Sequence, residues 1–216
     1  NMDPYFELTG MAYKITPFRH EKDPNPNKLG GVDTEVMYDN VMNKFQWGNM
    51  DKEELYMDEN NLRLTTNIRL QLANLADELI KEEKNDLAHD IIDKAFEVMP
   101  ERNVPLNRVV LPLIEGYARV GDDEKAKAYA MRLFEINEKE LEYFSTLEGK
   151  FLKRLDDELQ INMYVAQRIQ YMAEQYELKE LGDHVKERIP LMQSLYEQAQ
   201  QSIQNDGRKS GESVKF

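Results

Sequence analysis

The chain has 216 residues, 41% of them apolar, which is enough for one large domain or two small ones with a real hydrophobic core. Its formal net charge of −13 disfavours binding to nucleic acid or to an anionic lipid surface, because both need clustered basic residues. The absence of cysteine excludes disulfides, thiolate metal sites and cysteine nucleophiles, but it fits a periplasmic protein as well as a cytosolic one.

The first 32 residues predict an extended arm. Residues 5–16 are rich in aromatic and β-branched side chains and have a proline on either side, which is typical of a strand. Residues 24–31 are rich in proline and glycine and predict a turn-rich linker. No later segment resembles a partner strand, so this strand lies against the helices or pairs with a missing upstream segment or a second protomer. We favour the missing segment, and the start at Asn1 fits an excised fragment.

A first helix is expected to begin after Asp33, whose side chain suits a helix cap. Its apolar residues recur at helical spacing, and we expect it to end near Gly48-Asn49. An acidic, amide-rich loop follows, and Asn60 or Asn61 is expected to cap the next helix.

Residues 69–138 carry small and apolar residues in the order of a tetratricopeptide (TPR) repeat. The first unit has one helix to about Glu82, a turn at 84–86 and a second helix that stops at Pro100. The second unit covers 107–141. Its repeat alanine, Ala126, follows the repeat alanine of the first unit, Ala88, by 38 residues (126 − 88), whereas a consensus repeat has a period of about 34 residues. We expect Pro112 to bend the first helix of this second unit, because proline removes a backbone hydrogen bond.

Residues 149–204 predict two longer amphipathic helices, the second kinked at Pro190, that close the stack as a third hairpin. The tail 205–216, which contains Gly, Ser and Lys, is expected to be disordered. The sequence therefore predicts an all-α fold of TPR-like stacked helical hairpins over 33–204, preceded by a short extended or β arm over 1–32.

No motif for catalysis or metal binding is found in the sequence. His20, His89 and His184 are isolated in different segments, and we interpret them as surface histidines. The acidic runs 122–124 and 156–158 are interpreted as solvated faces, and nothing selects a carboxylate pair for a hydrolase. We therefore predict a non-enzymatic chain with no cofactor and no metal.

A binding groove is expected along the outward positions of the first helix of each unit. These positions mix charged and apolar side chains, which suits a peptide, although they equally fit an ordinary solvated surface. The predicted groove residues are Ala73, Asp77, Lys81, Leu111, Glu115 and Arg119.

A second candidate site combines aromatic and amide side chains, a combination that binds sugars. In the alternative interpretation, Phe45 and Trp47 cover the open end of the following helix and the asparagines cap helix ends. The cluster consists of Tyr38, Asn40, Asn43, Phe45, Trp47 and Asn49. Exposure of Trp47 in a cleft beside Asn40 and Asn43 favours sugar binding, and burial of Trp47 disfavours it.

The block 32–60 carries a set of short motifs that resemble a known family. They read Val32-Asp33-Thr34, Met37-Tyr38-Asp39-Asn40, Met42-Asn43-Lys44-Phe45, Trp47-Gly48-Asn49-Met50 and Asp58-Glu59-Asn60. These motifs resemble the C-terminal region of bacterial multi-spanning membrane proteins of uncharacterised type, related to protein O-mannosyltransferases. The preceding segment, with Leu8, Gly10-Met11-Ala12-Tyr13 and Pro17, is also similar, and the resemblance covers most of residues 5–140.

The resemblance implies that this chain is the tail of a glycosyltransferase-like protein, outside the membrane. It implies a periplasmic position, with a cytoplasmic one as the alternative, and it places any catalytic residues in the missing membrane portion. Our hypothesis is a non-catalytic interaction or scaffold tail whose partner is a protein, a peptide or the membrane portion of its own chain. The alternatives are a carbohydrate-binding or hydrolytic module and a purely structural tail.

Overall fold

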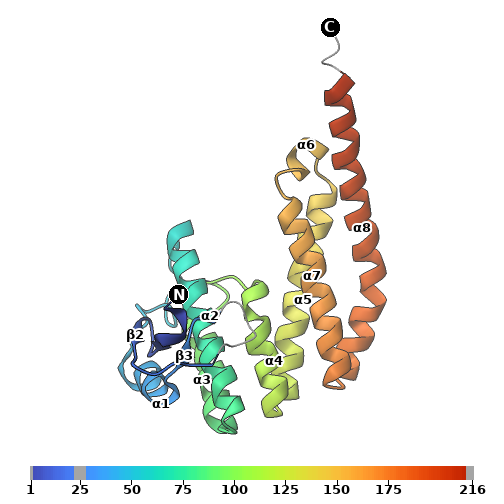
Figure 1. The fold of residues 1–216 in the computed structure, drawn as a ribbon. Helices are drawn as coiled ribbons and strands as arrows, with labels where there is room; N and C mark the ends of the chain where they lie inside the picture. The colour runs from blue at the N-terminus through green and yellow to red at the C-terminus, as the bar shows by residue number, and fades with distance from the viewer. Residues whose placement is uncertain (1, 22–27, 213–216) are drawn as a thin grey trace. The chain divides into compact units, whose positions relative to one another are not determined.

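The computed structural model describes residues 2–21 and 28–212 (Figure 1). The chain forms two compact units, Asn1–Asp122 and Asp123–Phe216. It is 70% helical with 4% strand, so the predicted all-α class with a short N-terminal arm is confirmed. The helical region divides at Asp122, whereas the sequence predicts one helical domain over 33–204.

The arm contains a small three-stranded sheet. Strands β1 (Phe6–Leu8) and β2 (Tyr13–Ile15) are antiparallel, with Phe6 opposite Ile15. Strand β3 (Gly31–Val32) runs parallel to β1, which gives the order β2-β1-β3. The expectation of one strand over 5–16 with its partner outside the chain is therefore wrong. The segment turns back at Gly10, and the third strand of the sheet begins at Gly31, in the stretch that the sequence predicts as a turn-rich linker.

Polar contacts hold the arm on one face of helix α2 (Glu59–Lys81). The Tyr13 hydroxyl hydrogen-bonds the side chain of Gln71, and burial of Tyr13 raises the pKa of that hydroxyl. Just after the arm, the Thr34 hydroxyl donates to the carboxylate of Glu82, the residue that follows α2, at 3.0 Å. Lys28 bonds to Glu78, which lies between these two contacts along the helix. Residues 71, 78 and 82 recur at helical spacing, so the arm follows a single face.

Helix α1 (Thr34–Asp39) begins as predicted, because the Asp33 carboxylate accepts a hydrogen bond of 3.1 Å from the Val36 amide. It continues as one π-helical turn, Asn40–Lys44, and so ends earlier than expected. Gly48 and Asn49 both have positive φ and form a turn after the helix.

Helix α2 is capped by Asp58, not by Asn60 or Asn61 as expected. The Asp58 side chain accepts a hydrogen bond of 2.7 Å from the Asn61 amide. The two asparagines are instead the second and third residues of the helix. A capping side chain must come before the first residue of a helix, and Asp58 has that position.

Helices α2, α3 (Asn85–Val98) and α4 (Leu111–Val120) pack on one another in the first unit. Their buried apolar residues follow the predicted spacing, but the turn after α2 covers 82–84, two residues earlier than the predicted 84–86. The predicted bend at Pro112 is wrong. Pro112 is in the first turn of α4, where its missing N–H has no helical partner in any case. Gly121 (φ +86) ends α4 in the left-handed conformation.

The second unit consists of α5 (Asp123–Ser145), α6 (Gly149–Leu152), α7 (Asp156–Gln175) and α8 (Lys179–Glu212). Helix α5 packs against α7 and α8, whereas α4 packs against α2 and α3. The two helices of the predicted second repeat therefore belong to different compact units. The first of the two long helices predicted over 149–204 is divided into α6 and α7.

The end of α8 differs from the sequence-based expectation. The helix contains Pro190 and continues to Glu212, where the sequence predicts a disordered tail from Asn205. Continuing an existing helix costs far less than nucleating one, which explains how a weakly apolar segment can remain helical. Residues 213–216 lie outside the described part of the chain. Across that part, no helix has both the length and the low charge that crossing a bilayer requires.

Candidate functional site

The first unit contains a cavity of about 300 Å³ between α2 and α4, which we call the α2–α4 groove. Small and apolar side chains form most of its walls, and charged side chains gather at one part of its lining. The lining residues are Lys28, Leu70, Ala73, Asn74, Ala76, Asp77, Ile80, Pro112, Glu115, Gly116 and Arg119. Gly116 also lets α4 approach α3, since a Cβ at this position would come 2.7 Å from Cδ1 of Ile92.

Asp77 is the centre of a charged cluster in the groove. Its Oδ1 lies 2.6 Å from Nη1 of Arg119, and its Oδ2 accepts from Lys28 and lies 3.0 Å from Nζ of Lys81. Glu78 bonds to the same two lysines, at 2.7 Å from Lys28 and 2.9 Å from Lys81. The cluster thus joins α2, α4 and the arm through three cations and two carboxylates.

The protonation of Asp77 follows from these contacts. Burial by itself would raise the pKa of Asp77, but hydrogen bonds from Lys28, Arg119 and Lys81 hold it well below its usual range. Asp77 is therefore ionised at neutral pH, and its negative charge is paired with the three cations of the cluster.

The structure brings most of the predicted groove residues together. Ala73, Asp77, Glu115 and Arg119 line the cavity, and Lys81 joins it through Asp77. Leu111, the first residue of α4, is buried and does not line the groove.

Sequence reasoning missed Asn74 and Lys28. Asn74 is buried, and its amide group donates to Gln71 at 3.3 Å. Its position in the otherwise apolar run 72–76 of a helix could have identified Asn74 as a buried polar residue. Lys28 lies far from α2 in the sequence and gave no such signal.

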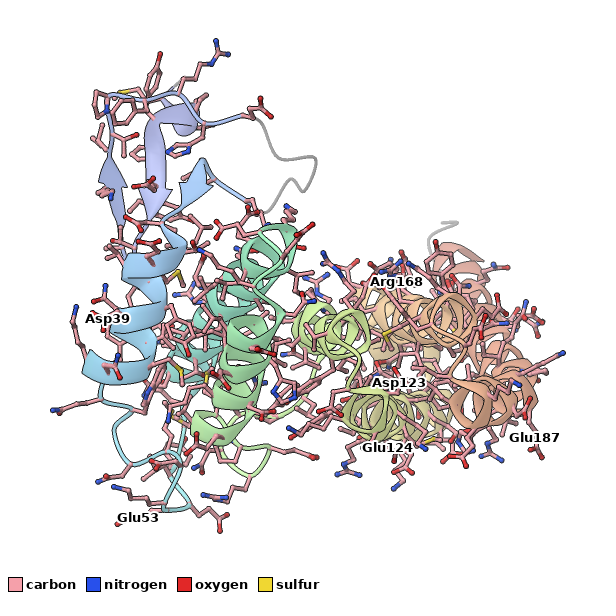
Figure 2. The ribbon with its side chains drawn as sticks, turned by 90° about the horizontal axis from the view of Figure 1, so that it is seen from below. Asp39, Glu53, Asp123, Glu124, Arg168 and Glu187 are labelled. Atoms are coloured by element: carbon pink, nitrogen blue, oxygen red, sulfur yellow. The ribbon has the colours of Figure 1, made fainter. Side chains whose placement is uncertain are left out.

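Several polar groups of the aromatic–amide cluster bind other parts of the protein. The Tyr38 hydroxyl donates to Asp90 at 3.0 Å, and the Asn40 amide donates to the main-chain oxygen of Thr9 at 2.7 Å. Asn43 donates to Asp39, which is labelled in Figure 2.

The two rings of the cluster contact each other. Phe45 and Trp47 are in edge-to-face contact with ring centroids 6.0 Å apart, and Trp47 is half-buried. A Cβ at Gly10 would come 2.7 Å from the Phe45 ring, so this ring packs on the arm. Asn49 is exposed in the turn that follows. The α2–α4 groove has no lining residue from this cluster.

The three histidines, interpreted as surface residues, are half-buried, and each contacts a neighbouring segment. His89 lies 2.8 Å from Asp122 and joins α3 to the end of α4. His20 lies 3.6 Å from Glu7, and the His184 ring is in edge-to-face contact with Phe134. In the part of the chain that the structure describes, no three His, Asp or Glu side chains are arranged to hold a metal ion.

The acidic runs lie at helix starts. Asp123 and Glu124, which are labelled in Figure 2, are in the first turn of α5. Residues 156–158 are in the first turn of α7. Negative charge is favourable there because it faces the positive end of the helix dipole. Asp122 is separate from this arrangement because it pairs with His89.

Comparison with known proteins adds no relative. No protein-family model matches the chain, and neither a curated protein nor a solved structure is significantly similar to it.

Proposed function

We propose that this chain is a non-catalytic interaction domain that binds a protein partner through a peptide segment in the α2–α4 groove. The observation that carries the proposal is the convergence of Ala73, Asp77, Glu115 and Arg119 on one cavity of about 300 Å³. Cavities of this size that combine apolar walls with a few polar groups are typical binding sites.

The groove suits a side chain of a bound peptide. Ala73, Ala76 and Gly116 leave room between α2 and α4, and Leu70, Ile80 and Pro112 supply apolar contact. The charged cluster around Asp77 fixes the orientation of a ligand, because ionic hydrogen bonds are directional and are stronger when partly buried. A segment of a partner can therefore bury an apolar stem and pair its polar end.

The resemblance of residues 32–60 supports the wider setting of this proposal. In that setting the domain is the tail of a glycosyltransferase-like membrane protein, on its periplasmic side, and holds a protein substrate or partner near the membrane-embedded active site. Deleting residues 33–204 from such a full-length protein tests this role. Unchanged partners and unchanged glycan transfer would contradict it.

The aromatic–amide cluster offers less support for sugar binding. The Asn40 amide and the Tyr38 hydroxyl, two of the groups that would bind a sugar, donate to Thr9 and Asp90. A sugar would have to replace these bonds without a net gain in hydrogen bonding.

A substitution at the mouth of the groove tests peptide binding. Pro112 is exposed, lines the groove and is the second residue of α4, so Pro112→Phe puts a bulky ring into the groove without replacing a buried residue. Asn60→Phe is the matched control, because Asn60 is the exposed second residue of α2 and is outside the groove. Each peptide of a library of capped peptides is added to the isotope-labelled chain, and the backbone amide chemical shifts of the chain are measured by NMR.

We expect some peptides to shift the amide signals of Ala73, Asp77 and Gly116. Pro112→Phe should abolish these shifts and Asn60→Phe should leave them intact. If no peptide shifts these amides, or if binding survives Pro112→Phe, the groove is not the binding site.

A further inference from the structure

The α2–α4 groove already holds a lysine of its own chain. Lys28 comes from the arm and lines the cavity, and only 5% of its side chain is exposed. Its ammonium group donates to Asp77 and, at 2.7 Å, to Glu78. A lysine that is almost fully buried is uncommon and requires paired charges. Asp77 and Glu78 supply this pairing.

The pocket around this lysine remains compensated when Lys28 is absent. Asp77 is also paired with Arg119 at 2.6 Å, and both carboxylates are paired with Lys81. Removing the Lys28 ammonium therefore leaves neither carboxylate unpaired. Glu115 also lines the groove, so without Lys28 the site has three carboxylates against the two cations Arg119 and Lys81, and it can accept another cation.

The surroundings of the pocket favour a basic ligand. Ala73, Ala76 and Ile80 form apolar walls, which suit the aliphatic stem of a lysine. The net charge of −13 attracts positively charged segments over a longer range and raises their rate of association. The ligand chemistry is thus an ammonium group on a flexible apolar stem, carried by an extended chain.

We propose that the α2–α4 groove recognises a peptide segment that presents a lysine, and that Lys28 occupies this lysine site within the chain and competes with the partner. This inference rests on the proposed function and names its ligand. The arm then acts as a tethered competitor, because a tethered group has a high effective concentration at its site.

The test uses the full chain with Lys28→Ala and a capped synthetic peptide with the sequence of residues 24–32. A second peptide carries norleucine in place of its lysine, which keeps the stem and removes the charge. Binding is measured by calorimetry. We expect Lys28→Ala to bind the lysine peptide about tenfold more tightly than the wild-type chain does, because the competitor is gone. The norleucine peptide should bind about tenfold more weakly than the lysine peptide.

Two further variants complete the test. Lys28→Ala combined with Asp77→Asn and Glu78→Gln should lose the lysine preference. Lys44→Ala is the control, because Lys44 is paired with Asp39 outside the groove, and it should bind the lysine peptide as the wild-type chain does. The intensity of Trp47 fluorescence verifies that each variant is folded.

The outcomes separate this inference from the proposed function. Equal binding of the two peptides by Lys28→Ala, or binding of neither, overturns the lysine site. If peptides from the library still shift the groove amides in that case, the groove remains a peptide site with another ligand. If Pro112→Phe leaves all peptide binding intact, the proposed function fails as well.

Discussion

The guanidinium of Arg69 donates a hydrogen bond of 2.6 Å from Nη2 to the main-chain oxygen of Met99 and so joins the middle of α2 to the end of α3. The same group donates to the main-chain oxygens of Val104 and Pro105, each at 3.1 Å. Arg69 is fully buried. It therefore fixes the connection that leads into α4, and with it one wall of the α2–α4 groove.

Replacing this arginine should destabilise the first unit. Arg69→Met keeps much of the volume but leaves three carbonyl oxygens without their donor, and hydrogen bonds to charged groups contribute about 1.5–3 kcal/mol each. We expect the free energy of unfolding to fall by about 3 kcal/mol. Urea denaturation followed through Trp47, the one tryptophan of the chain, reports on this unit.

Arg63→Met is the matched control for this prediction. Arg63 is an exposed residue of the same helix, so its replacement should change the free energy of unfolding by less than about 0.5 kcal/mol. An Arg69→Met protein as stable as this control would show that the three carbonyl contacts contribute little.

The ion pairs of Asp77 make the first unit sensitive to acid. Because the folded pKa of Asp77 lies below its unfolded value of about 3.9, its contribution to stability is complete above that value and is lost as the pH falls through the folded pKa. Asp77→Asn should lower the stability by about 1–2 kcal/mol at pH 7 and reduce the further loss below about pH 4.

Urea denaturation between pH 7 and pH 2.5 measures this effect. Glu53→Gln is the control, because Glu53 is an exposed loop carboxylate (Figure 2), and its acid profile should match the wild type. Parallel acid profiles for Asp77→Asn and the wild type would rule out a role for Asp77 in acid sensitivity.

Local patterns in the sequence were sufficient for the helices. Leu72, Leu75 and Leu79 recur at helical spacing and are buried as predicted, and Asp33 caps α1 as predicted. Both features depend on residues within one or two helical turns. Four of the six predicted groove residues line the cavity for the same reason, since positions three and four apart share a helix face.

The contacts between distant segments could not be read in this way. Strand β3 is two residues long and is stabilised by its pairing with β1. Lys28 belongs to the site only because it bonds to Glu78 of α2, which is 50 residues later in the sequence. Pro112 fits an interior position and a first-turn position of a helix equally well until the start of α4 is known. Such features follow from tertiary packing, which a single sequence does not encode in any local pattern.

Asn103 holds the loop between α1 and α2 by a different set of contacts. Its amide group donates to the main-chain oxygens of Met50 at 2.7 Å and Glu53 at 2.6 Å, and its Oδ1 accepts from the Leu55 amide at 2.8 Å. Only 3% of the side chain is exposed. Asn103→Ala should therefore lower the stability of the first unit by about 2–3 kcal/mol, since three backbone groups lose their partner.

Hydrogen exchange at residues 50–55 provides the specific readout for Asn103→Ala. The Leu55 amide should exchange faster, whereas Asn43→Ala, which removes an exposed side-chain bond to Asp39, should leave its exchange unchanged. Unaltered exchange in Asn103→Ala would mean that the loop is held by other contacts.

Two glycines with similar backbone angles differ in their surroundings, which allows strain and clash to be measured separately. Gly30 (φ +68) lies beside β1, where a Cβ would come 1.9 Å from the main-chain oxygen of Phe6. At Gly48 (φ +60), by contrast, an added Cβ would meet no other atom within 4 Å. Gly48→Ala should thus cost about 1 kcal/mol, which is the strain of a left-handed residue that carries a side chain.

Gly30→Ala should cost at least twice as much as Gly48→Ala, because the main chain of β1 must move in addition. The loss is measured by urea denaturation, and hydrogen exchange at Phe6–Leu8 locates it. Since Gly30 is two residues from Lys28, displacement of β3 should also weaken the Lys28 contact with Glu78 and raise the affinity of the groove for the lysine peptide. Equal losses for the two variants would show that the clash with the main chain of β1 adds no cost to the strain.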